Sequence, residues 1–137
     1  MIKRIIFDID GTLITGVNFT PFIEEALKKY GVTDYSSKAL IYAKNILSYE
    51  EAYNRYDIDL YLSFFSEKLG VDLDNNFFHL LTEELKGAIS KEGPTIKKML
   101  SNLQDYELVI LSNFFEEIQR NKLKSMGIND YFSEYYG

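Results

Sequence analysis

The spacing of apolar residues changes along the chain, and it divides the chain into an N-terminal strand, a long helical stretch and a C-terminal part of mixed helix and strand. Residues 2–7 form a short, nearly continuous apolar run with β-branched members, which is typical of a buried strand in a parallel sheet. From Thr20 to about Ile89 the apolar positions recur at helical spacing. After Gly93 the pattern predicts one helix and then a second apolar strand at 107–111.

The long helical stretch predicts four helices joined by short connections. Thr20 is a candidate N-cap, Pro21 suits the first helical position, and Gly31 follows the last residue of an apolar stripe. Consecutive amphipathic helices of this kind predict an antiparallel bundle. The other three helices are expected at 37–47, about 50–69 and about 74–89.

The C-terminal part returns to alternating helix and strand. A helix is predicted after the strand at 107–111 and should end at Gly127, and residues 131–136 are a candidate third strand. The order predicts an α/β fold with a parallel sheet, interrupted by a helical insertion. The expected division is an α/β core of residues 1–16 and 91–137, with a helical cap of residues 17–90.

Composition narrows the range of partners. The net charge of −6 disfavours binding to nucleic acids or anionic membranes. The chain has no cysteine, which excludes disulfides and thiolate metal sites. No run approaches the roughly 18 apolar residues that a membrane span requires. We therefore expect a cytoplasmic protein whose many aromatic residues pack in its core.

Two acids follow the first predicted strand. Side chains two residues apart on a strand face the same side, so Asp8 and Asp10 should present two carboxylates at the end of the strand, where open α/β sheets bind ligands. Two adjacent carboxylates repel unless a cation neutralises them, and oxygen ligands favour Mg²⁺. Gly11 allows a sharp turn that brings backbone amides close to an anion. The alternative is an ordinary turn that only ends the strand.

This pair suits covalent phosphoryl transfer. One carboxylate can attack phosphorus to form an aspartyl phosphate, and the other can serve as general acid and base. After the second strand, the Ser112 hydroxyl can hold a phosphate oxygen beside the N-terminus of a helix. The alternative is that Ser112 or Asn113 only caps that helix.

Together the two segments resemble a known family. FDIDGTL at 7–13 and LSN at 111–113 are similar to the first two motifs of the haloacid dehalogenase (HAD) superfamily of phosphohydrolases. The resemblance implies an incomplete HAD-type Rossmann-like core with an inserted four-helix-bundle cap. It assigns Asp8 as nucleophile and Mg²⁺ ligand, and Asp10 as general acid/base with its carbonyl on the metal. The implied phosphate-binding residues are Ile9, Gly11, Thr12, Ser112 and Asn113.

The resemblance also implies parts that the chain lacks. The third motif's lysine and the fourth motif's acids would follow Gly137, and neither Lys122 nor Lys124 matches that lysine. The chain alone is therefore expected to be weakly active or inactive. The strand at 2–7 should be left as an exposed edge, so we expect a homodimer or strand swap through it, or a fragment of a longer protein.

The sequence thus predicts a Mg²⁺-dependent phosphohydrolase that acts on a small phosphorylated metabolite, such as a sugar phosphate or phosphoglycolate. The alternatives are a phosphomutase of the same superfamily and a catalytically silent fragment that binds metal or phosphate or oligomerises. A phosphoacceptor domain of the response-regulator type is less favoured, because such domains lack a helical insertion after the first strand.

Overall fold

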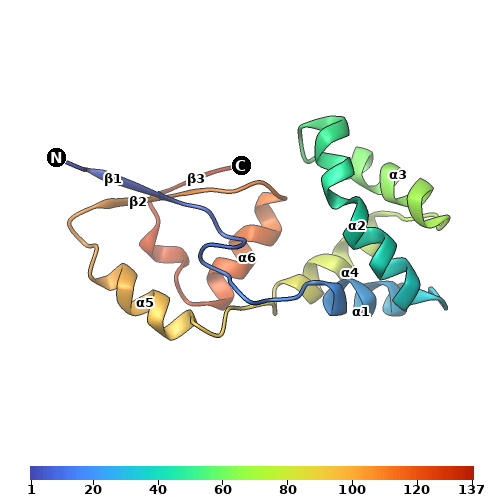
Figure 1. Cartoon of the computed structure of the whole chain (residues 1–137), viewed down its shortest axis with the longest axis horizontal. Coiled ribbons are helices and arrows are strands. Elements are labelled where there is room, and N and C mark those ends of the chain that lie inside the picture. Colours follow the sequence, from blue (N-terminus) through green and yellow to red (C-terminus); the bar gives the residue numbers. More distant parts are fainter. The chain divides into compact units, whose positions relative to one another are not determined.

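The computed structural model describes all 137 residues, which form two compact units (Figure 1). The α/β unit comprises Met1–Val17 and Lys86–Gly137, and the helical unit comprises Asn18–Leu85. The boundaries expected from the sequence are after residues 16 and 90. None of the helices combines the length and hydrophobicity that a membrane crossing needs.

A three-stranded parallel sheet organises the α/β unit. Its strands β1 (Arg4–Phe7), β2 (Glu107–Leu111) and β3 (Glu134–Tyr136) lie in the order β1-β2-β3. Phe7 is opposite Ile110, and Leu111 is opposite Tyr136. The strands therefore end at one common edge, and the predicted α/β fold with a parallel sheet is confirmed.

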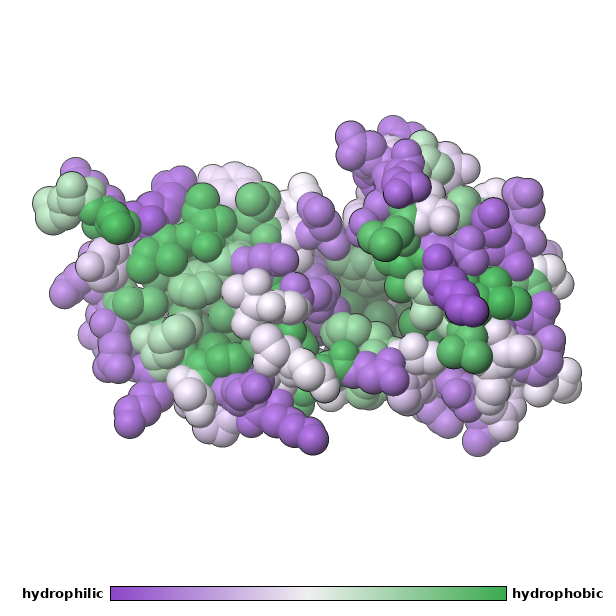
Figure 2. Space-filling view, in the orientation of Figure 1, coloured by the Kyte–Doolittle hydropathy of each residue, from purple (hydrophilic) through white to green (hydrophobic).

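Two helices connect these strands, and both lie on the same side of the sheet (Figure 1). They are α5 (Gly93–Ser101) and α6 (Glu116–Ser125), and a 3₁₀ turn, η1 (Asn129–Tyr131), leads into β3. Right-handed crossovers that progress in one direction across a sheet place their helices on one face. No helix of this unit covers the other face, and apolar side chains gather on the surface of the unit (Figures 1 and 2).

The free edge of β1 remains a predicted pairing surface between copies of the chain. β1 pairs only with β2, and its Ile6 side chain is 58% exposed beside an apolar hollow of about 600 Å³. We expect concentration-dependent self-association, and Ile6→Lys should shift it toward monomer because a charge on an edge strand opposes pairing. Sedimentation velocity measures this, with Leu47→Lys on the helical unit as the control. A wild-type monomer at all concentrations would count against pairing.

The helical unit contains the four predicted helices with different boundaries. They are α1 (Thr20–Tyr30), α2 (Tyr35–Tyr53), α3 (Ile58–Leu69) and α4 (Asn75–Leu85). The expected break near Glu50 is absent, because α2 continues until Asn54 adopts a left-handed conformation with φ 49°. Asp57 then caps α3 by accepting a hydrogen bond from the Leu60 N–H at 3.0 Å.

Aromatic side chains fill the centre of the helical unit. The Phe65 ring stacks on that of Tyr42 with ring centroids 4.1 Å apart, and the Tyr42 and Tyr61 hydroxyls are hydrogen bonded to each other. Burial raises the pKa of both tyrosines. Tyr42, Tyr61 and Phe65 therefore serve as core, as predicted for the aromatic residues, whereas Tyr53 is 38% exposed.

Candidate active site

The candidate site lies where β1 and β2 end. Asp8 directly follows β1 and Ser112 directly follows β2, so the parallel pairing of these strands brings both residues to one edge of the sheet. A cavity of about 320 Å³ opens there. It is lined by Asp8, Asp10, Leu111, Ser112 and Asn113.

A tight turn after β1 presents the two acids. The carbonyl of Ile9, whose side chain is fully buried, accepts hydrogen bonds from the N–H groups of Thr12, Leu13 and Ile14 at 3.2, 2.9 and 2.8 Å. Gly11 has φ 79°, a left-handed conformation that favours glycine, and its N–H donates to the Ile14 carbonyl at 2.8 Å. The N–H groups of Gly11 and Thr12 are thus used inside the turn, and anion binding by these residues stays a prediction.

The Asp8 carboxylate is exposed and makes no ion pair. Its Oδ1 atom accepts one hydrogen bond, from the Ile9 N–H at 2.8 Å. Because this bond holds one oxygen, the other oxygen of Asp8 is left available to the cavity.

The Asp10 carboxylate lies in a different environment. Lys122 Nζ lies 3.1 Å from Oδ1 and 3.4 Å from Oδ2, and Gln119 Nε2 donates to Oδ2 at 3.0 Å. Charge-assisted hydrogen bonds of this kind fix both the position and the charge of a carboxylate. The two acids that line the cavity therefore differ. Asp8 is exposed to solvent, whereas Asp10 is fixed by Lys122 and Gln119.

Lys122 is the site residue that the sequence analysis missed. Its side chain is only 3% exposed, and the Nζ atom also lies 5.6 Å from the centre of the Phe114 ring. Burial lowers the pKa of Lys122, while the charge of Asp10 and the hydrogen bond to it act in the opposite direction. A signal was present in the sequence, because Ile118 and Lys122 are four residues apart and so place a lysine on the apolar face of a helix.

Ser112 is buried and takes part in the same network. Its Oγ accepts a hydrogen bond from Gln119 Nε2 at 2.8 Å, and its N–H donates to the Tyr136 carbonyl at 2.9 Å. A hydroxyl that accepts from a neighbour still has its own hydrogen to donate. Neither Ser112 nor Asn113 caps α6, since Phe115 is the N-cap residue and no side chain caps the helix.

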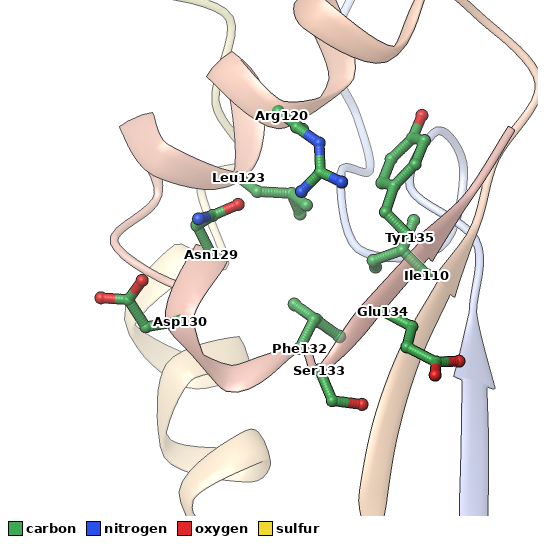
Figure 3. Close-up of a pocket in the computed structure, with 9 residues that line it drawn as sticks. All are labelled: Ile110, Arg120, Leu123, Asn129, Asp130, Phe132, Ser133, Glu134 and Tyr135. Atoms are coloured by element: carbon green, nitrogen blue, oxygen red, sulfur yellow. The ribbon is translucent and has the colours of Figure 1, made fainter.

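A second, polar cavity of about 230 Å³ lies beside α6, η1 and β3 (Figure 3). The Arg120 guanidinium lies 4.8 Å from the centre of the Tyr135 ring. Burial raises the pKa of the Tyr135 phenol and the nearby Ser112 lowers it, but the phenol makes no hydrogen bond of ordinary geometry. Arg120 and Tyr135 are among the residues that line this cavity.

The acid-lined cavity offers few ligands for a metal ion. Mg²⁺ prefers six oxygen ligands in octahedral geometry, and the cavity has only two carboxylates. One of these, Asp10, already pairs with Lys122, and no cluster of three or more acidic, histidine or cysteine side chains suited to a metal occurs in the chain. These residues do not by themselves form a Mg²⁺ shell, although members of the family often use this ion.

The sequence matches a family described as haloacid dehalogenase-like hydrolases over residues 5–137. The chain belongs to this family. No curated protein matches the sequence significantly. The resemblance noted in the two motifs is therefore confirmed at the level of the superfamily, and membership supports an enzyme of the hydrolase class.

Solved structures share the fold. Two structures of L-2-haloacid dehalogenase from Xanthobacter autotrophicus match the whole chain, with TM-scores of 0.64 and 0.66 and sequence identities of 20% and 18%. The second has chloropropionic acid covalently bound. A hydrolase from Streptococcus pneumoniae TIGR4 matches 98% of this chain and 66% of its own, with 20% identity and a TM-score of 0.47. The chain spans 57% of the length of the two dehalogenase structures.

These comparisons correct the predicted specificity. The two sequence motifs predict a phosphohydrolase that forms an aspartyl phosphate, with a phosphomutase as an alternative. The dehalogenase structures belong instead to an enzyme that acts on 2-haloacids, in which a carbon–halogen bond is hydrolysed. A carboxylate pair at a strand end suits attack on carbon as well as on phosphorus, so the motif did not determine the bond that is broken.

Proposed function

We propose that the chain carries the nucleophilic site of a hydrolase that acts on small 2-haloacids through an ester of Asp8. The observation that carries this proposal is the difference between the two acids. Asp8 is exposed and unpaired, whereas Asp10 is held by Lys122 and Gln119. Two carboxylates in different environments can take different roles, one as nucleophile and the other as base.

In the first step the free oxygen of Asp8 attacks the carbon that bears the halogen. The carbon–halogen bond breaks and its electron pair leaves with the halide, so that no proton is needed. Asp8 becomes an ester whose carbonyl oxygen is Oδ1, the atom that accepts the Ile9 N–H at 2.8 Å. The hydrogen bond on Oδ1 directs reaction to the other oxygen.

In the second step water clears the ester. A water oxygen attacks Cγ of Asp8, and Asp10 takes the proton. The negative charge that develops on Oδ1 is stabilised by the Ile9 N–H, which acts as an oxyanion donor. The bond from Cγ to the substrate oxygen then breaks, Asp10 gives its proton to that oxygen, and a 2-hydroxy acid leaves. Asp8 remains as a carboxylic acid and releases the second proton of the water to solvent, which restores its carboxylate.

The negative charge of the substrate carboxylate is repelled by the two acids of the cavity, so its binding requires hydrogen-bond donors. The Ser112 hydroxyl can donate because its oxygen already accepts from Gln119, and the exposed Asn113 lies next to it. Lys122 reduces the repulsion by neutralising Asp10. These contacts support binding of a small organic anion.

Trapping the ester tests the proposal. The protein is mixed with L-2-chloropropionate in ¹⁸O-labelled water, and free chloride and intact mass are followed. We expect chloride release, a mass increase of one 1-carboxyethyl group on Asp8, and ¹⁸O in Asp8 after the ester is cleared. Formation of the ester uses only Asp8, so it should occur even in a chain that turns over weakly or not at all. The absence of both adduct and one equivalent of chloride at all substrate concentrations would therefore reject the 2-haloacid assignment.

Adduct formation should not change when divalent metal ions are removed. Asp10 is neutralised by Lys122 rather than by a metal, and halide departure requires no Lewis acid in the steps above. The rate of adduct formation in EDTA should equal the rate in Mg²⁺, measured by quenched-flow mass spectrometry. A loss of more than about tenfold in EDTA, equivalent to about 1.4 kcal/mol of barrier, would show that a metal is needed.

A further inference from the structure

The charge balance of the acid-lined cavity depends on one buried lysine. Lys122 approaches Asp10 from α6, and its side chain is almost fully buried, whereas that of Asp10 is 39% exposed. The ammonium group therefore lies on the protein side of the carboxylate, and the cavity lies on the other. Lys122 does not line the cavity, and its ion pair with Asp10 is the contact that links it to the site.

This arrangement carries an energetic cost that packing alone does not explain. Burial disfavours a charged lysine, and the fold accepts this at a position where an apolar side chain would fit the helix face. Gln119 uses its amide N–H group on both Asp10 and Ser112, and its Oε1 atom is buried with no hydrogen-bond partner. Buried side-chain oxygens without a hydrogen-bond partner are uncommon in folded proteins.

We propose that Lys122 is a built-in counter-cation: it neutralises and orients Asp10 where a divalent ion would otherwise be attracted. Lys122 is a positioning residue, since it touches Asp10 and not the substrate. The part that concerns catalysis rests on the proposed function, in which Asp10 activates the water that clears the Asp8 ester. The part that concerns metal binding does not depend on the proposed function.

Binding of Mn²⁺ tests the counter-cation directly. Lys122→Gln leaves two carboxylates without their cation, so Mn²⁺ should bind at least about tenfold more tightly than to the wild type, as measured by electron paramagnetic resonance of free Mn²⁺. Lys122→Arg should bind it as weakly as the wild type, and adding Asp10→Asn to Lys122→Gln should remove the gain. Lys124→Gln is the matched control, because it removes the same charge from an exposed position on α6.

A second measurement tests the catalytic part by separating the two steps. At saturating substrate, where weaker binding of the substrate carboxylate no longer limits the rate, Lys122→Gln should form the Asp8 ester at a rate within about threefold of the wild type. It should clear the ester at least about tenfold more slowly, because only the second step uses Asp10. Lys122→Arg should restore clearance. A merely structural lysine would affect both steps together.

The outcomes are distinguishable. If Lys122→Gln remains folded, by far-UV circular dichroism, and binds Mn²⁺ no better than the wild type or Lys124→Gln, the counter-cation proposal is overturned. If the wild type forms no adduct but Lys122→Gln binds Mn²⁺ more tightly than the wild type, the proposed function is rejected and the counter-cation proposal is supported. If Lys122→Gln slows both steps equally, the link through Asp10 is rejected.

Discussion

Asp8→Asn should abolish the covalent adduct and reduce chloride release from L-2-chloropropionate by at least about a thousandfold. An amide oxygen is a far weaker nucleophile than a carboxylate oxygen, so the first step should fail. The Ile9 N–H, which now donates to Asp8 Oδ1, can donate to the amide oxygen in the same place. The loss should therefore be chemical, with the turn after β1 unchanged.

The matched control for this substitution is Asp105→Asn, which makes the same change at an exposed position before β2. It should leave the adduct and the chloride release as in the wild type. Peptide mapping of the wild-type adduct should place the added group on residue 8. An adduct that persists in Asp8→Asn, or that maps to another acid, would mean that Asp8 is not the nucleophile.

The carboxylates of the site could be predicted because local rules place them. Asp8 and Asp10 do line one cavity, but the turn after β1 places them there and not the strand alternation assumed in the prediction, since β1 ends at Phe7. Parallel pairing of β1 and β2 brings Ser112 to the same edge. Lys122 could not be found in this way. Its contact with Asp10 joins residues 112 positions apart, and it depends on how α6 packs against the sheet.

The fold was predictable where one local signal dominates. Pro21 and Gly31 lie at the limits of α1, as predicted, because of backbone restrictions that tertiary contacts do not change. The predicted N-cap was wrong, since Phe19 occupies that position and Thr20 is already helical. The end of α2 was not predictable, because residues 47–53 contain no helix-breaking residue and Asn54 ends the helix only by adopting φ 49°. The placement of both helices on one face of the sheet also depends on strand order, which apolar runs do not encode.

The helical unit should depend most strongly on Phe65, and Phe65→Ala should lower its free energy of unfolding by about 3–5 kcal/mol. The Phe65 side chain is fully buried, and its ring centroid lies 4.1 Å from that of Tyr42 and 4.7 Å from that of Tyr61. Removing the ring leaves a cavity among aromatic groups that are fixed by their own contacts, including the Tyr42–Tyr61 hydrogen bond, so the site cannot easily collapse.

Urea unfolding followed by near-UV circular dichroism of the tyrosines measures this loss, and Phe64→Ala is its matched control. Phe64 is the adjacent residue of the same type on α3, but it is only partly buried, so its loss should lower the free energy of unfolding by less than half as much. Such a difference would show that the aromatic cluster stabilises the unit through burial on one helix face. Equal losses for the two substitutions would show instead that stability follows aromatic content on α3, and that the stacked contact with Tyr42 contributes nothing of its own.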